Sequence, residues 1–276
     1  MVSIMSNRIR RIAVFIDGGF FLKRLPHLHI PDDFRDTSKS VAKTAYELCK
    51  RHVLRIIGGQ HEQDGRWLDH AYRFFYYDAL PYEGQVHHPL TDRLIRYAHS
   101  PEASFRRELF NNLRRMRKFA VRLGHVDKAG GWRIKDRRKL KSLLKTSQIA
   151  HILSEIAEGR AVEALSSQDR ELLRQLAQEW QGLREEDLLF DLRQKGVDMR
   201  LGVDITSIVL KKQADTLVIV TGDSDFVPVA KLARREGAEV ILDPLWQGVQ
   251  PGLHEHIDGL YSVIGADKGQ QQNSAP

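Results

Sequence analysis

Three aspartates stand where short apolar runs of the sequence end. Asp17 closes the run RIAVFID, and Asp223 and Asp225 follow the run TLVIV in the motif TGDSD. Continuous runs rich in β-branched residues are typical of strands buried on both faces of a parallel sheet, and ligands bind at the carboxyl ends of such strands. We therefore expect the three carboxylates to share one crevice. Because clustered carboxylates repel one another, this crevice is predicted to bind a divalent cation such as Mg²⁺.

The stretch from Asp215 to Leu242 holds the elements that must position two of these carboxylates. The pattern predicts a strand over residues 217–220 and then the acidic loop. A helix follows, with Pro228 in its first turn and its end at Gly237, and a second strand covers residues 238–242. These elements form one βαβ unit with Asp223 and Asp225 at the carboxyl end of its first strand.

A third motif, KGVDMRLGVD, carries Asp198 and Asp204, and apolar residues at helical spacing follow it. Together with FIDGG and the stretch ADTLVIVTGDSDFVPVAKLARREGAEVIL, it resembles the NYN domain of LabA-like proteins, a branch of the PIN-like nuclease superfamily. The resemblance implies a Rossmann-like three-layer α/β/α sandwich with a mostly parallel central sheet. It also implies clustered aspartates that bind Mg²⁺ or Mn²⁺ and hydrolyse RNA.

Site residues can be carried over from the family motif by motif. The metal ligands and catalytic residues implied in this way are Asp17, Asp204, Asp223 and Asp225, with Asp198, Ser224 and Thr221 as supporting residues. Many NYN proteins have Asn three residues after the first aspartate, where this chain has Phe20. The implied reaction is attack on a phosphodiester by a metal-activated water, which needs no side-chain nucleophile. The predicted enzyme is an Mg²⁺- or Mn²⁺-dependent endoribonuclease.

Two alternatives belong to other classes of protein. Haloacid-dehalogenase-like phosphatases also place aspartates at strand ends, but they need a second aspartate two residues after the first, where this chain has Gly19. The other alternative is a catalytically silent NYN-like module that binds RNA or a protein partner. Loss of Mg²⁺-dependent turnover on mutation of Asp17 would distinguish an enzyme from such a module.

The basic residues are concentrated in one part of the chain. The net charge is +7, and the segment 106–145 holds 15 Lys or Arg against three acidic residues. A basic segment beside an acidic, cation-binding crevice suits a nuclease, with RNA as the expected partner and DNA as a possible one. The alternative is that these cations only cover solvated helix faces. The predicted nucleic-acid-binding residues are Arg114, Arg115, Arg117, Lys118, Arg137, Arg138 and Lys139.

The predicted organisation is one NYN (PIN-like) domain over residues 1–265 and a disordered polar tail over 266–276. Residues 119–125 and 132–135 are predicted to form a hairpin. Leucines at three- and four-residue spacing then predict an almost wholly helical insertion over about 137–194. This insertion could cover the crevice, bind a protein partner, form a homo-oligomer or only extend the scaffold.

Several function classes are disfavoured by the composition. No apolar run approaches the roughly 18 residues of a membrane span, so no membrane partner is expected. Cys49 is the only cysteine, which excludes an internal disulfide and fits a cytoplasmic protein. His87 and His88 lack a third ligand and are interpreted as loop residues. Asp78 lies near the carboxyl end of the predicted strand 72–80, but it belongs to no matched motif and is not assigned to the site.

Overall fold

The computed structural model describes residues 9–31, 36–159 and 165–265, so the predicted tail over 266–276 lies outside the described residues. The chain divides into two compact units. Unit 1 holds the described residues up to Tyr82, the segment Tyr97–Val126 and the residues from Gln194 onward. Unit 2 holds Glu83–Arg96 and Asp127–Arg193.

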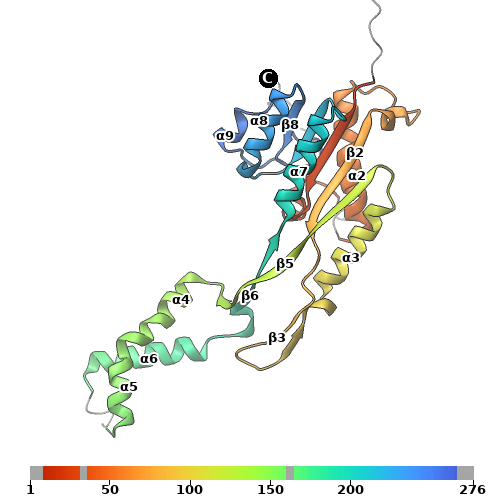
Figure 1. Cartoon of the computed structure of the whole chain (residues 1–276). Helices are drawn as coiled ribbons and strands as arrows, with labels where there is room; N and C mark the ends of the chain where they lie inside the picture. The colour runs from red at the N-terminus through yellow and green to blue at the C-terminus, as the bar shows by residue number, and fades with distance from the viewer. Residues whose placement is uncertain (1–8, 32–35, 160–164, 266–276) are drawn as a thin grey trace, which may run out of the picture. The chain divides into compact units, whose positions relative to one another are not determined.

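Unit 1 contains most of a seven-stranded sheet (Figure 1). Its order is β6-β5-β2-β1-β7-β8-β9, and all five pairs from β5 to β9 are parallel. The strands are β1 (Ile12–Asp17), β2 (Ala71–Ala79), β5 (Phe119–Ile134), β6 (Leu188–Lys195), β7 (Thr216–Val220), β8 (Glu239–Asp243) and β9 (Gly259–Leu260). The predicted α/β fold with a mostly parallel central sheet is therefore confirmed.

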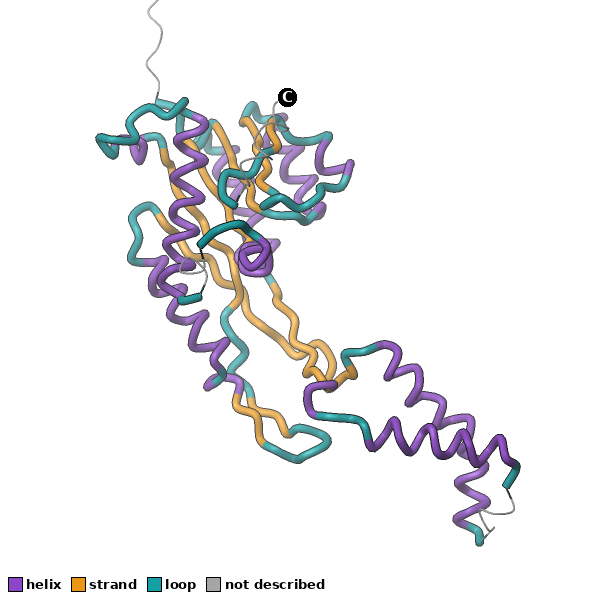
Figure 2. Tube along the Cα trace, turned by 180° about the vertical axis from the view of Figure 1, so that it is seen from behind, coloured by secondary structure: helices purple, strands orange, loops and turns teal. Residues whose placement is uncertain are grey.

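Helices cover both faces of this sheet. Because side chains alternate along a strand, Val14 and Ile16 of β1 pack on the face covered by α2 and α3, whereas Ala13 and Phe15 pack on the face covered by α7 and α8. Figures 1 and 2 show the molecule from opposite sides, so each looks onto a different face of the sheet. The helices of unit 1 are α1 (Gly18–Arg24), α2 (Ser38–Ile56), α3 (Pro101–Arg114), α7 (Val197–Leu210), α8 (Val227–Arg235) and α9 (Pro251–His254). Its 3₁₀ turns are η1 (Leu25–His27), η3 (Arg66–Asp69), η4 (Tyr97–His99) and η8 (Ser224–Phe226).

The predicted βαβ unit is present as β7, α8 and β8. Pro228 lies in the first turn of α8, where its missing amide hydrogen costs no helical bond. Gly237 follows the helix at φ +83°, a left-handed conformation that glycine adopts without strain. The local sequence thus sets both ends of the helix that lies between the acidic loop and β8.

Unit 2 contains a two-stranded antiparallel hairpin and a small helical cluster. Ile149, Ile152, Leu165 and Leu176 form the buried centre of the helices. The elements of unit 2 are β3 (Gln85–His87), β4 (Leu94–Arg96), α4 (Arg137–Leu144), η5 (Lys145–Ile149), α5 (Ala150–Ala157), α6 (Ser167–Gln181) and η7 (Glu185–Asp187).

Two predictions about the segment 119–194 were wrong. Residues 119–134 form the single strand β5 and not the predicted hairpin of 119–125 with 132–135; the neighbour of β5 at this edge of the sheet is β6. Residues 188–194 belong to β6 and are not helical, so helices cover only part of the expected insertion. In the described part of the chain, no helix is long and apolar enough to cross a membrane.

Candidate active site

The order of the strands creates a crevice beside β1. The chain passes from β1 through α2 to β2 on one side, and β7, on the other side of β1, leads through α8 to β8. Since α2 and α8 cover opposite faces, the two connections diverge at the carboxyl ends of β1 and β7. Such a switch point is where open α/β sheets bind ligands. Asp17 is the last residue of β1, and Asp223 lies just beyond the end of β7.

Hydrogen bonds hold Asp17 and the acidic loop together. Asp17 Oδ1 accepts from the Phe20 amide at 3.0 Å, and its Oδ2 accepts from the Thr221 hydroxyl at 3.4 Å. Thr221 Oγ1 in turn accepts from the Asp223 amide at 3.2 Å, and Asp223 Oδ1 accepts from the Asp225 amide at 2.9 Å. Thr221 is fully buried, and its hydroxyl links the carboxylate of Asp17 to the backbone of Asp223.

Four aspartates form an electrostatically linked acidic cluster: Asp17, Asp198, Asp223 and Asp225. Burial raises the pKa of Asp17 to about 6, and the negative charges of Asp198, Asp78 and Asp223 act in the same direction, against the Phe20 amide. The pKa of Asp198 is also raised, first by burial and then by the charges of Asp223 and Asp225. The folded chain therefore concentrates negative charge at this one place.

The structure separates the two aspartates of the KGVDMRLGVD motif. Both lie on α7, but only Asp198 raises the pKa of Asp17. Asp204 Oδ2 instead accepts from the Tyr77 hydroxyl at 2.9 Å and from Arg122 Nε at 3.1 Å. Its charge is thus balanced by an arginine, whereas the charge of Asp198 acts on the pKa of Asp17.

Asp78 is a residue that the motifs did not indicate. Its carboxylate is fully buried at the end of β2, where Oδ1 accepts from Arg106 Nη1 at 2.5 Å and from Gln194 Nε2 at 3.1 Å. Burial raises the pKa of Asp78, and the Arg106 guanidinium opposes that rise. The sequence signal was the position of Asp78 at a strand end, beside β1. Arg106 carried no such signal because only the fold brings it to Asp78.

Phe20 packs where the family often has Asn. A Cβ added at Gly222 would lie 2.8 Å from Phe20 Cε2 and 2.9 Å from Gln247 Nε2. The phenyl ring therefore lies against Gly222 of the acidic loop, and a side chain at this position would require Phe20 and Gln247 to move. Ser224 begins η8 in this loop and is half-buried.

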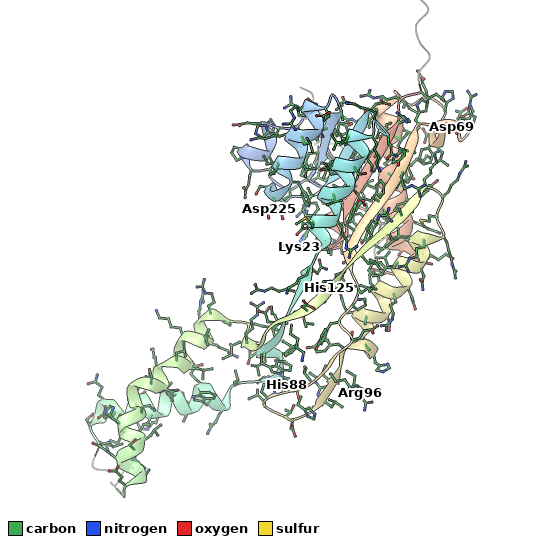
Figure 3. The ribbon with its side chains drawn as sticks, in the orientation of Figure 1. Lys23, Asp69, His88, Arg96, His125 and Asp225 are labelled. Atoms are coloured by element: carbon green, nitrogen blue, oxygen red, sulfur yellow. The ribbon has the colours of Figure 1, made fainter. Side chains whose placement is uncertain are left out.

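The predicted basic residues of unit 1 do not surround the acidic cluster. Lys118 Nζ donates to the Ala71 carbonyl at 2.8 Å, at the amino end of β2, whereas the cluster lies about 20 Å away at the carboxyl ends, since a strand rises about 3.3 Å per residue. Arg114, Arg115 and Arg117 are exposed close to Lys118 in sequence. Figure 3 shows these two ends of unit 1, marked by Asp69 and Asp225.

The remaining basic residues lie on α4 in unit 2. Arg137 and Arg138 are exposed, whereas Lys139 Nζ lies 2.6 Å from Asp187 Oδ2. A groove of about 660 Å³ lies in unit 1, near the amino ends of the strands, lined by Lys43, Tyr46, Glu47, Arg51, Met116 and Arg117. Of the predicted basic residues, those of unit 1 therefore lie remote from the cluster.

The chemistry of the acidic cluster fits a hard divalent cation. Carboxylate oxygens are the ligands that Mg²⁺ prefers, and Mg²⁺ binds through one or two carboxylates while it keeps several waters. Within the described ranges, no three His, Cys, Asp or Glu side chains converge on one point. The carboxylates therefore provide the donor type that Mg²⁺ prefers, but the described residues do not form a ready-made site of three ligands.

Replacing Asp17 by Asn should change the pH dependence of stability. Between pH 3.8 and about 6, the folded chain keeps a proton on Asp17 that the unfolded chain has lost, so stability falls as the pH rises through this window. Asn keeps an acceptor for the Phe20 amide and removes this penalty. We expect Asp17→Asn to be more stable than the wild type by about 2 kcal/mol at pH 7.5, and equal to it near pH 3.8. Urea unfolding at both pH values measures this, and a difference that does not depend on pH would contradict it.

The comparisons with known proteins include one family and two similar proteins. The family model described as NYN domain matches residues 104–245. An uncharacterized protein of Methanocaldococcus jannaschii is 38% identical over 68 residues, which cover 25% of this chain and only 27% of that protein. A crystal structure of a protein of unknown function from Vibrio parahaemolyticus aligns with 96% of this chain and 98% of its own, at 13% identity and a TM-score of 0.42.

Proposed function

The chain belongs to the NYN domain family of PIN-like nucleases, and from this premise we propose that it is an Mg²⁺- or Mn²⁺-dependent endoribonuclease. The observation that carries the proposal is the meeting of Asp17 and Asp223 at the switch point of the sheet, with Asp198 and Asp225 beside them. The motifs quoted above favour the LabA-like branch. A phylogeny of NYN sequences that places the chain outside that branch would contradict this finer assignment.

Asp17 and Asp223 would bind the cation directly, and Asp198 and Asp225 would contact it through its bound waters. A divalent ion bound there would supply an acidified water and neutralise charge on the scissile phosphate. Thr221 keeps Asp17 and Asp223 at a fixed separation through its two hydrogen bonds. Asp225 is exposed and is therefore placed to orient the attacking water and accept its proton. We assign Asp204 the role of anchoring α7 to β2 and β5 through Tyr77 and Arg122.

Cleavage of a mixed panel of nucleic acids tests the proposed function. Labelled single-stranded RNA, structured RNA and DNA would be incubated with the full chain in Mg²⁺, in Mn²⁺ and after EDTA treatment. We expect internal cuts in RNA that depend on the metal. An intact panel under every metal, together with retained RNA binding, would instead identify a catalytically silent binding module. If the protein cuts DNA in preference to RNA, DNA would take the place of RNA as the proposed substrate.

The arginines at the amino ends of the strands are proposed to bind RNA far from the scissile bond. The double variant Arg115→Ala/Arg117→Ala should bind long RNA more weakly, and its salt slope should fall by about 1.4, or about 0.7 for each lost phosphate contact. Cleavage of an oligonucleotide too short to reach these residues should be unchanged. Filter binding at several salt concentrations measures the slope, with the exposed Arg174→Ala as control. If the double variant loses cleavage equally on short and on long RNA, binding of RNA by these arginines at a distance from the scissile bond would be contradicted.

A further inference from the structure

An apolar groove lies between α7 and α8, beside the acidic cluster. It has a volume of about 530 Å³, and its apolar lining includes Met199, Val203, Phe226 and Val229. Gly202 faces α8, since a Cβ added there would lie in van der Waals contact with Val229 Cγ2, at 3.4 Å. Every residue of the groove belongs to unit 1, so the groove is a feature of that unit alone.

Two side chains of α7 in this groove are unusually exposed for their type. Met199 is 73% exposed and Val203 is 58% exposed, one helical turn apart. Phe226, by contrast, is buried at 3% exposure and is part of the core under the sheet face. Truncating Met199 or Val203 would therefore leave the packing of the fold almost intact, which makes both positions suitable for a functional test.

The two ends of the groove have different chemistry. Asp198 and Asp225, two members of the acidic cluster, line one end, and the hydroxyl residues Thr206 and Ser207 line the other. Asp198 and Thr206 are about 12 Å apart along the helix, because an α-helix rises 1.5 Å per residue. The groove is thus continuous with the place where a scissile phosphate would bind under the proposed function.

We propose that this groove is a subsite for an unpaired base of the nucleic acid whose phosphate is bound at the acidic cluster; this inference rests on the proposed function. Among the described residues, none that lines the groove is basic. Because phosphates are bound mainly by Lys and Arg, the phosphate backbone is disfavoured as the occupant. A base offers flat apolar faces and a polar edge, and these match the aliphatic walls and the hydroxyls of Thr206 and Ser207. A base within a duplex is paired and stacked, so the entering nucleotide must be unpaired.

The test combines protein variants with RNA that lacks single bases. The double variant Met199→Ala/Val203→Ala removes the exposed walls of the groove. Leu210→Ala is the matched control, because Leu210 lies on the same helix at 54% exposure and outside the groove. Each protein would be tested on single-stranded RNA in which one abasic position is moved along the chain, by kcat/KM and by fluorescence anisotropy binding.

We expect the double variant to lose about tenfold in kcat/KM and in affinity on intact RNA, with Leu210→Ala unchanged. One abasic position near the cut should lower the kcat/KM and the affinity of the wild type by the same factor. It should cause no further loss of either quantity in the double variant. If the losses from the double variant and from the abasic RNA add up, or if no abasic position lowers activity or binding, the proposed subsite is overturned. Sedimentation that shows a wild-type dimer broken by Met199→Ala/Val203→Ala would assign the groove to a second copy instead. The anisotropy measurement of binding needs no turnover. It therefore tests whether the groove binds a base even if the protein does not cleave RNA and the proposed function fails.

Discussion

Replacing Asp223 by Asn is expected to reduce metal-dependent RNA cleavage by about 10²- to 10³-fold, equivalent to the several kcal/mol that a catalytic cation contributes to a phosphodiester transition state. Asp223 has one structural role, because its Oδ1 accepts from the Asp225 amide at 2.9 Å. The Asn side-chain oxygen can accept the same hydrogen bond. The variant should therefore keep the melting temperature of the wild type and lose only the charge that holds the cation.

The matched control for Asp223→Asn is Asp69→Asn. Asp69 is an exposed carboxylate at the other end of the strands (Figure 3), and its replacement changes the net charge by the same amount. Single-turnover cleavage of labelled RNA in saturating Mg²⁺ should be normal for this control. Equal rates for Asp223→Asn and the wild type would remove Asp223 from the site and refute the assigned chemistry.

Replacing Arg106 by Ala is expected to destabilise the fold by about 3–5 kcal/mol, the usual cost of leaving one member of a buried ion pair without its partner. The Asp78 carboxylate is fully buried and would retain the Ala79 amide and Gln194 as hydrogen-bond donors. Loss of the guanidinium would raise the pKa of Asp78 further. Because protonation then relieves the buried charge, the destabilisation should be smaller at pH 5 than at pH 7.5.

Urea unfolding at the two pH values measures the effect of Arg106→Ala. Glu102→Gln is the control, because Glu102 also contacts Arg106 but its side chain is 70% exposed, so its loss should cost little. The double variant Asp78→Asn/Arg106→Met should recover part of the stability, since it leaves no buried charge. A loss below about 1 kcal/mol in Arg106→Ala, or one independent of pH, would show that the pair is not buried as described.

The position of the site could be predicted from the sequence because local signals determine it. The apolar runs before Asp17 and Asp223 are read correctly as buried parallel strands, and β1 and β7 are direct neighbours in the sheet. Pro228 and Gly237 fix the helix between them through their own backbone preferences. These features require no knowledge of distant contacts, so the residues alone indicate them.

Long-range contacts explain what the sequence could not reveal. Asp198 and Asp204 lie on one helix, and their different environments depend on Tyr77 and Arg122, which come from other strands. The pairing of Asp78 with Arg106 likewise requires α3 to lie beside β2. The strand β6 was mistaken for helix because leucines at short spacing are compatible with both structures, and only its pairing with β5 decides between them.

Joint measurement of Mn²⁺ binding and RNA cleavage tests the central claim most directly. Binding would be followed by calorimetry on the full chain, and cleavage of single-stranded RNA would be measured over the same Mn²⁺ concentrations. The proposed function predicts that cleavage rises together with Mn²⁺ binding, and that Asp223→Asn loses both while Asp69→Asn keeps both. RNA cleavage that continues at full rate in EDTA, or Mn²⁺ binding unaffected by Asp223→Asn, would contradict a cation-dependent nuclease site at the acidic cluster.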